Sequence, residues 1–229
     1  MFLKKILVWI FKTIVALVIF SVVLTAIYTV VNPPLTPLML IRVFEGLADA
    51  KAVGISKDWE SYDNISPHVF RAVIAAEDGK FLKHEGFDWK AIENAQKRNE
   101  RAKGKKLYGA STITMQTAKN AFLWPGRSYL RKGLEAYFTV LIEALWGKKR
   151  ILEVYVNIIE WGDGIYGVEA ASQEYFKKPA KNLTAQEAAL LASVLPNPRR
   201  WTPAKPTKYI LKRRSFIQTR MRGIALPKE

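Results

Sequence analysis

The sequence contains no cysteine and only two histidines, His68 and His84, among its 229 residues. The absence of cysteine excludes disulfide bonds, thiolate metal sites and a cysteine nucleophile. Two histidines are too few for a metal centre built from several histidines. Because 49% of the residues are apolar and 24% are charged, the composition is that of a globular chain and not of a disordered or collagen-like one. The length predicts one ordinary domain with a short appendage.

Acidic side chains are in the minority, which leaves a large positive charge. Lysine and arginine number 36 against 20 aspartates and glutamates, so the formal net charge is +16. An excess of this size indicates an anionic partner. Phosphate, nucleic acid and acidic lipid all fit, and charge alone does not choose among them.

One long segment has no charged residue at all. Residues 13–31 are uncharged, and at about 1.5 Å per residue a helix of this length spans roughly 28 Å, close to the ~30 Å hydrocarbon core of a bilayer. The alternative is a cleaved signal peptide, but the apolar run exceeds the usual ~7–15 residues of such peptides and no A-x-A site follows it. The segment therefore predicts one uncleaved transmembrane helix.

Three lysines, Lys4, Lys5 and Lys12, precede this segment and set its orientation. The positive-inside rule places them in the cytoplasm and the rest of the chain outside. Genomic nucleic acid is absent there, so the anionic partner is expected to be a phosphate-bearing lipid or a cell-wall precursor. The predicted organisation is a cytoplasmic tail, a transmembrane helix, a membrane-proximal segment and a main domain, at residues 1–12, 13–31, 32–60 and 61–229.

The main domain has the sequence pattern of an all-α, or nearly all-α, fold. No alternating run of β-branched residues is longer than a few positions, and residues that favour helix N-caps recur along the chain. Residues 97–106, which are mostly basic and lack apolar periodicity, predict a mobile loop. We expect helices to begin at Ser66, Asp88, Ser111, Ser128, about Lys149, about Ile165, Thr184 and Thr207.

Glu77 is a carboxylate in an unusual place. It follows Val73 and Ile74 by helical spacing, so it shares their apolar face in the last turn of a predicted helix. Burial and the negative end of the helix dipole both favour its protonated form, which would raise its pKa toward the range of a general acid or base. The alternative is an amphipathic side chain that reaches solvent at a helix end.

Two further segments carry polar groups suited to anions. Ser111 opens a helix, and Thr112, Gln116 and Lys119 recur on one of its faces, so its free N–H groups predict a phosphate site. The alternative is a plain serine cap on a surface helix. Downstream, Arg127, Arg131 and Lys132 surround Glu135, which should stay ionised among these cations. A solvated surface ion pair between Arg131 and Glu135 is the simpler reading of that segment.

Four motifs, in order, resemble those of glycosyltransferase family 51, the peptidoglycan glycosyltransferases. They are E-D-x-x-F-x-x-H-x-G-x-D at 77–88, G-x-S-T-I-T-M-Q-x-x-K-N at 109–120, R-K-x-x-E at 131–135 and K-x-x-I-L-E-x-Y-x-N at 148–157. A fifth stretch, 162–178, is similar to the next segment of the family. Ala110 and Val156 depart from residues common in the family, and neither position carries a reactive group. The chain resembles the monofunctional members, since it contains no S-x-x-K, S-x-N or K-T-G.

The resemblance implies a lysozyme-like, mainly helical domain with a smaller membrane-proximal lobe in a bacterial inner (cytoplasmic) membrane. It implies polymerisation of lipid II into β-1,4-linked glycan by an inverting mechanism, with release of undecaprenyl diphosphate and without transpeptidase activity. Leu38–Val43 and Ala121–Pro125 are the expected lipid-contacting segments. The expected partners are lipid II, the nascent glycan strand and the membrane; other cell-wall synthesis or division proteins stay open.

The resemblance also assigns roles to residues. Glu77 would be the general base, and Glu135 would orient the acceptor or assist the leaving group. No covalently bound cofactor is implied, and a divalent cation, Mg²⁺ or Mn²⁺, is left open. The residues expected to bind substrate, or to support the base and the cleft, are Asp78, Phe81, His84, Ser111, Thr112, Gln116, Lys119, Asn120, Arg127, Arg131 and Lys132.

Two other classes of function fit parts of the pattern. A lytic enzyme that cleaves existing glycan also uses a glutamate in a helical domain, but it requires an acid and has no use for the cations. An anchored scaffold that recruits partners through its basic surface would not require Glu77 and Glu135 at their matched positions.

Overall fold

The computed structural model describes residues 2–48, 54–103, 107–126 and 128–227, and these are mainly helical, as predicted. Short 3-10 turns at Tyr62–Asn64, Phe81–Lys83 and Ala180–Asn182 join some of the helices. The helices are α1 (Phe2–Ile27), α2 (Pro37–Ala48), α3 (Pro67–Glu77), α4 (Trp89–Ala102), α5 (Ile113–Phe122), α6 (Tyr129–Leu145), α7 (Lys148–Ile158), α8 (Val168–Phe176), α9 (Ala185–Val194) and α10 (Lys208–Met221).

Most predicted helix starts coincide with observed caps. The side chains of Ser66, Asp88, Ser128, Thr184 and Thr207 each accept a backbone N–H in the first turn of a helix, as N-cap residues do. The start predicted at Ser111 is wrong by one residue. Thr112 caps α5 instead, because its Oγ1 accepts the N–H of Met115 at 3.2 Å.

A small sheet replaces the helix start predicted near Ile165. β1 (Ser56–Lys57) pairs in parallel with β3 (Ile165–Tyr166), and β3 pairs antiparallel with β2 (Glu160–Gly162). Helix α8 begins only after Gly167, whose φ of +84° and closeness to Asp58 O, 2.9 Å from a Cβ placed there, leave no room for a side chain. Strands of two or three residues are too short to produce a recognisable alternation.

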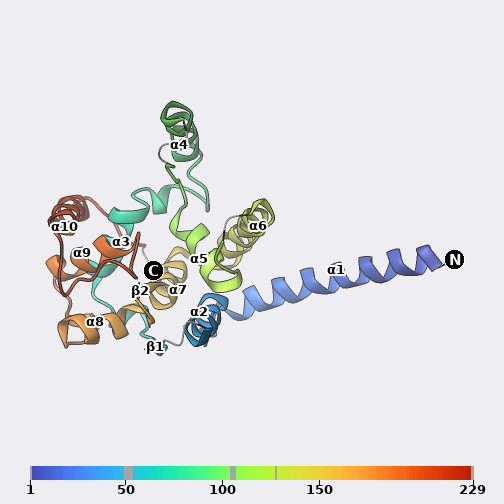
Figure 1. The fold of residues 1–229 in the computed structure, drawn as a ribbon, viewed down its shortest axis with the longest axis horizontal. Coiled ribbons are helices and arrows are strands. Elements are labelled where there is room, and N and C mark those ends of the chain that lie inside the picture. The colour runs from blue at the N-terminus through green and yellow to red at the C-terminus, as the bar shows by residue number, and fades with distance from the viewer. Residues whose placement is uncertain (1, 49–53, 104–106, 127, 228–229) are drawn as a thin grey trace.

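The mobile loop predicted over residues 97–106 is also wrong where the structure describes it. Helix α4 continues to Ala102, with an ion pair of 2.6 Å between Lys97 and Glu93 one turn apart on its exposed surface. Residues 104–106 lie outside the described part. Figure 1 shows that α4 projects from the body of the molecule. A helix in this position does not need the apolar face of a packed helix, which explains why the sequence lacks apolar periodicity there.

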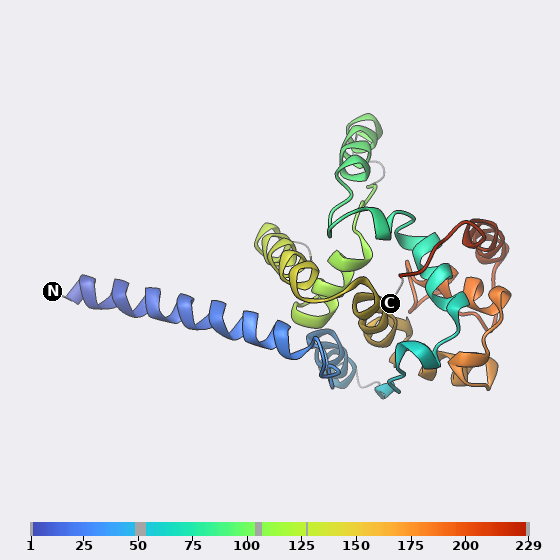
Figure 2. The same ribbon diagram turned by 180° about the vertical axis from the view of Figure 1, so that it is seen from behind.

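The core lies where α3, α7, α8 and α9 meet. Trp161, Tyr155 and Phe70 are among its largest fully buried side chains. In both views α9 and α10 flank α3 on the side away from α1, whereas α5 and α6 lie on the side nearest to α1 (Figures 1 and 2). Helices α3 and α10 therefore approach α5 and α6 from the opposite side of the molecule.

Helix α1 is long and apolar enough to cross a membrane. It begins at Phe2 and ends at Ile27, so it includes part of the expected tail, while the last residues of the expected 13–31 span form a turn. Its carboxyl end is attached to the domain. The Ser21 and Tyr137 hydroxyls lie 2.8 Å apart, and Trp146 Nε1 donates to Thr25 O at 2.8 Å. The apolar helix thus continues into the body through specific contacts with α6.

Helix α6 buries a polar face and exposes an apolar one. Arg131, Glu135 and Thr139 are buried, whereas Leu130 is 70% exposed. Of the segments expected to contact lipid, Ala121–Pro125 is only partly suitable, because Ala121 and Leu123 are buried and Trp124 is exposed. In Leu38–Val43, Met39 is buried and Leu40 is exposed. Exposed apolar side chains are present on both helices, with Phe44 and Leu47 on α2 and Leu130 and Val140 on α6.

Candidate active site

A cleft of about 1230 Å³ lies between α3, α4, α5, α6 and α10. Helix α3 ends in it, α5 forms its floor with the cap residue Thr112, and α6 and α10 contribute basic side chains. The structure brings most of the predicted site residues to this cleft: Glu77, Asp78, Ser111, Thr112, Gln116, Lys119, Asn120, Arg131, Lys132 and Glu135. Arg127 lies outside the described residues.

Glu77 is the last residue of α3, and each of its carboxylate oxygens has its own partner. Gln116 Nε2 donates to Oε2 at 3.2 Å, and Arg213 Nη2 lies 3.2 Å from Oε1. Tyr155 donates its hydroxyl to the other end of the Gln116 amide at 3.3 Å, which orients that amide. Burial raises the pKa of Glu77 above its ordinary value, although the hydrogen bond from Gln116 and the charge of Arg213 oppose the change. The predicted direction is confirmed.

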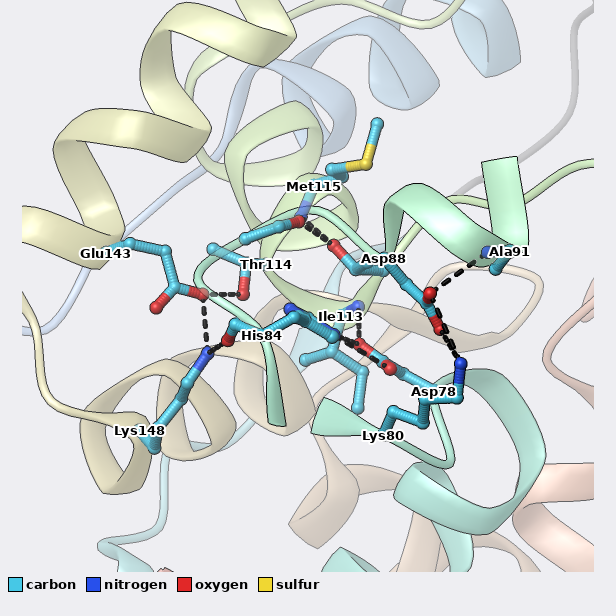
Figure 3. Close-up of polar contacts among 12 residues, drawn as sticks. Asp78, Lys80, His84, Asp88, Ala91, Ile113, Thr114, Met115, Glu143 and Lys148 are labelled. Atoms are coloured by element: carbon cyan, nitrogen blue, oxygen red, sulfur yellow. Dashed lines mark hydrogen bonds and ion pairs between the residues drawn. The ribbon is translucent and has the colours of Figure 1, made fainter. Parts of the chain in front are cut away.

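Asp78 connects the end of α3 to the start of α5. His84 Nε2 lies 3.0 Å from both oxygens of Asp78, and the Ile113 N–H donates to Asp78 Oδ2 at 3.0 Å (Figure 3). The first turn of α5 is thus bonded to Asp78 and to the cap residue Thr112. Two N–H groups of this helix start, those of Ile113 and Met115, already have partners within the protein and are not available to the phosphate predicted there.

Phe81 and His84, both predicted as substrate-binding or supporting residues, do not line the cleft. Phe81 is fully buried, and the His84 side chain is 8% exposed. Lys148 Nζ donates to His84 O at 2.7 Å and to Glu143 Oε1 at 2.7 Å (Figure 3). Both residues thus lie behind the cleft wall and not on its surface.

Glu135 is a second buried carboxylate, held by cations of its own helix. Its side chain is 4% exposed; Arg131 Nη1 donates to Oε2 at 2.5 Å, and Lys132 Nζ bonds Oε1. Arg131 is itself buried, so the reading as a solvated surface pair is wrong. The two cations lie at the cleft together with their carboxylate.

Lys119 links the two carboxylates electrostatically. Burial lowers its pKa, while Glu135 and, more weakly, Glu77 act in the opposite direction. Lys119, Arg131 and Lys132, called here the cationic cluster, place three positive charges around Glu135 on one side of the cleft. Such a cluster is suited to the oxygens of a phosphate or diphosphate.

A resident divalent cation does not fit the donor groups. Within the part of the chain that the structure describes, no three Asp, Glu or His side chains come together as metal ligands. Both oxygens of Glu135 are already bonded to Arg131 and Lys132.

Comparison with known proteins identifies the family. A model of the transglycosylase family matches residues 47–222. The chain belongs to the transglycosylase family. This transglycosylase is 56% identical over 205 residues to a biosynthetic peptidoglycan transglycosylase of Rhodospirillum centenum, covering 90% of the chain and 86% of that protein. It is 52% identical over 220 residues to a protein of the same name from Bdellovibrio bacteriovorus, covering 96% and 87%.

One residue of the cleft, Arg213, was not predicted from the sequence. It lies 136 residues after Glu77, in a basic stretch of α10 that resembles an ordinary solvated helix face. Only the packing of α10 on α3 reveals it. The sole sequence signal would have been basic residues that recur at helical spacing on the side of α10 that carries its apolar residues.

The raised pKa of Glu77 has a consequence for the stability of this transglycosylase. A carboxyl group whose pKa is raised by folding contributes stability at low pH that is lost as pH rises through the folded-state pKa. Glu77→Gln is therefore expected to raise Tm at pH 7 and to leave it nearly unchanged near pH 4, as measured by thermal melts at both values. A lower Tm for the variant at pH 7 would contradict the inference that the ionised form of Glu77 destabilises the folded protein.

Proposed function

We propose that this transglycosylase polymerises lipid II into β-1,4-linked glycan and releases undecaprenyl diphosphate. The observation that carries the proposal is the pairing of Glu77, partly buried and bonded at both oxygens, with the cationic cluster in one cleft. Glu77 is equipped to take a proton, and the cationic cluster is equipped to hold a diphosphate. The names of the relatives support peptidoglycan as the material that is made.

The donor is the nascent chain, whose reducing-end muramyl unit is α-linked to the diphosphate. Lys119, Arg131 and Lys132 hold that diphosphate and neutralise the charge that develops on it. Glu135 keeps Arg131 and Lys132 in position through its two bonds. The site thus stabilises the leaving group with fixed charges of the protein.

The acceptor is an incoming lipid II whose 4-hydroxyl lies against Glu77. The carboxylate takes the hydroxyl proton, and the oxygen attacks the donor's anomeric carbon from the face opposite the diphosphate. The new C–O bond forms as the bond to the diphosphate breaks, and the diphosphate leaves with the electron pair. Attack from the opposite face converts the α-linkage into a β-linkage.

Product chemistry tests this function. We expect one undecaprenyl diphosphate to be released for each disaccharide added, and we expect a product that muramidase, specific for β-1,4 linkages, digests completely. No peptide cross-links should form, since transpeptidase activity is not part of the proposal. Shortening of pre-made glycan strands, without release of the diphosphate, would instead show a lytic enzyme.

The location proposed is the inner membrane, with the amino terminus in the cytoplasm and the catalytic domain outside. Helix α1 supports a single-pass anchor and contacts α6 through the hydroxyls of Ser21 and Tyr137, and the Leu130 side chain of α6 is exposed. We propose that this apolar face of α6 contacts lipid, which keeps the cleft close to a substrate that stays in the bilayer.

The cysteine-free sequence allows a direct test of that contact. Leu130→Cys, labelled with an environment-sensitive dye in vesicles, is expected to show a blue-shifted emission relative to detergent-free denatured protein. The matched control is Lys181→Cys, at an exposed position in the 3-10 turn Ala180–Asn182, where the dye should report water. Equal emission at both sites would contradict lipid contact by α6.

A further inference from the structure

The carboxyl-terminal helix α10 reaches the cleft through Arg213. Helix α10 packs against α3 and α9, and this packing brings Arg213 Nη2 to 3.2 Å from Glu77 Oε1. The Arg213 side chain is 22% exposed and that of Glu77 18%. Among the residues that the structure describes, Glu77 is the only carboxylate that pairs with Arg213, and Arg213 Nε is buried without a partner. The guanidinium is thus committed to this one carboxylate.

The groups around Glu77 come from four elements and act differently on it. Asp78, its neighbour in the chain, adds a negative charge, and Gln116 of α5 binds Oε2 with a neutral amide. Lys119 of α5 acts through its charge at longer range, and Tyr155 of α7 acts through Gln116. Arg213 is the one cation in direct contact with the carboxylate among the described residues.

This arrangement leaves the two oxygens of Glu77 unequal. Oε1 faces a positive charge, which disfavours protonation there, whereas Oε2 faces a neutral amide N–H and has a second lone pair that can accept a substrate hydroxyl. A carboxylate in a buried place tends to be protonated and would then be useless as a base. The fixed charge of Arg213 at Oε1 counters that tendency. It also fixes the direction in which Oε2 points.

We propose that Arg213 is a positioning residue for the proton transfer, holding Oε1 of Glu77 so that the carboxylate stays ionised and its Oε2 faces the acceptor hydroxyl. The inference rests on the proposed function and adds α10 to the catalytic unit. The proton moves from the acceptor hydroxyl to Glu77, the acceptor oxygen bonds to the donor carbon, and the diphosphate leaves with the electron pair. Arg213 stays charged throughout and touches only Glu77.

The test compares Arg213→Ala and Arg213→Lys with the wild type in full-length protein and lipid II. For Arg213→Ala we expect kcat at neutral pH to fall by roughly tenfold to a hundredfold, because the base is misplaced and more often protonated, with KM nearly unchanged. The acid limb of its kcat–pH profile should move to higher pH. Arg213→Lys, which keeps the charge, should recover much of kcat and return the limb toward the wild-type position.

The matched control is Lys212→Ala, an exposed lysine beside Arg213 on the same helix, which should leave the profile unchanged. A loss in Arg213→Ala that is equal at every pH, and that lysine does not restore, would assign Arg213 a purely structural role and overturn the proposal. Unchanged kcat and pH limb would overturn it as well. If the wild type makes no glycan from lipid II, the proposed function fails, which is a separate result. Should Arg213→Ala not fold, Arg213→Gln, which removes the charge but keeps more of the side chain, replaces it with the same expected shift of the acid limb.

Discussion

Replacing Glu77 with glutamine is expected to reduce polymerisation of lipid II by roughly a thousandfold, since general-base catalysis contributes about 10²–10⁴ to such rates. Glutamine has nearly the same size and can still bond to Gln116, so the cleft keeps its shape. It cannot accept a proton, however. The loss should therefore appear in kcat, with little change in lipid II binding. Initial rates with fluorescent lipid II, together with a binding titration, measure both quantities.

Glu174→Gln is the matched control for this substitution. Glu174 is a glutamate on α8 whose side chain is 58% exposed, paired only with the exposed Lys177 at 3.8 Å. The same chemical change there should leave the rate within about twofold, because exposed ion pairs contribute little. A Glu77→Gln rate within tenfold of wild type would remove Glu77 from the role of base.

Replacing Glu135 with alanine is expected to cost both activity and stability. The carboxylate is nearly fully buried and is bonded to Arg131, which is buried too. Its removal leaves the charge of Arg131 without a partner, and breaking a buried ion pair in this way costs about 3–5 kcal/mol. Thermal melts should show Tm lower by roughly 6–15 °C. The polymerisation rate should fall as well, because the cationic cluster loses the group that holds it.

A double substitution separates the two effects. Exchanging a buried ion pair for apolar side chains of similar volume is often neutral for stability, so Arg131→Met with Glu135→Leu should regain most of the lost Tm. Activity should not return, because the diphosphate site has lost a cation. Lys132→Ala, at a side chain 47% exposed, should change Tm by much less. Full activity in the double variant would contradict the role given to Arg131 and Glu135.

Features that depend on neighbouring residues could be predicted from the sequence. The starts of α3 and α9 follow from Ser66 and from the capping box of Thr184 with Glu187, because a cap and its partner lie within one turn. The burial of Glu77 follows from its helical spacing to Val73 and Ile74. Each of these predictions needed no knowledge of the tertiary fold.

Features that depend on distant contacts could not be predicted. The buried face of α6 includes Arg131 and Glu135, which face the cleft, while Leu130 of the same helix is exposed. Asp78 accepts the N–H of Ile113 at the start of α5 across 35 residues of sequence, so one donor expected to face phosphate is already bonded. Arg213 reaches Glu77 from the far end of the chain. Amphipathic spacing defines a face, and only packing determines what that face meets.

The measurement that tests the account most directly is a polymerisation assay with the full-length protein in lipid vesicles. Fluorescent lipid II is added to the wild type and to Glu77→Gln, and the products are separated by gel before and after muramidase digestion. We predict a ladder of glycan strands made only by the wild type and erased by muramidase. A folded wild-type protein that binds lipid II and yields no ladder, or an equal ladder from Glu77→Gln, would contradict the account.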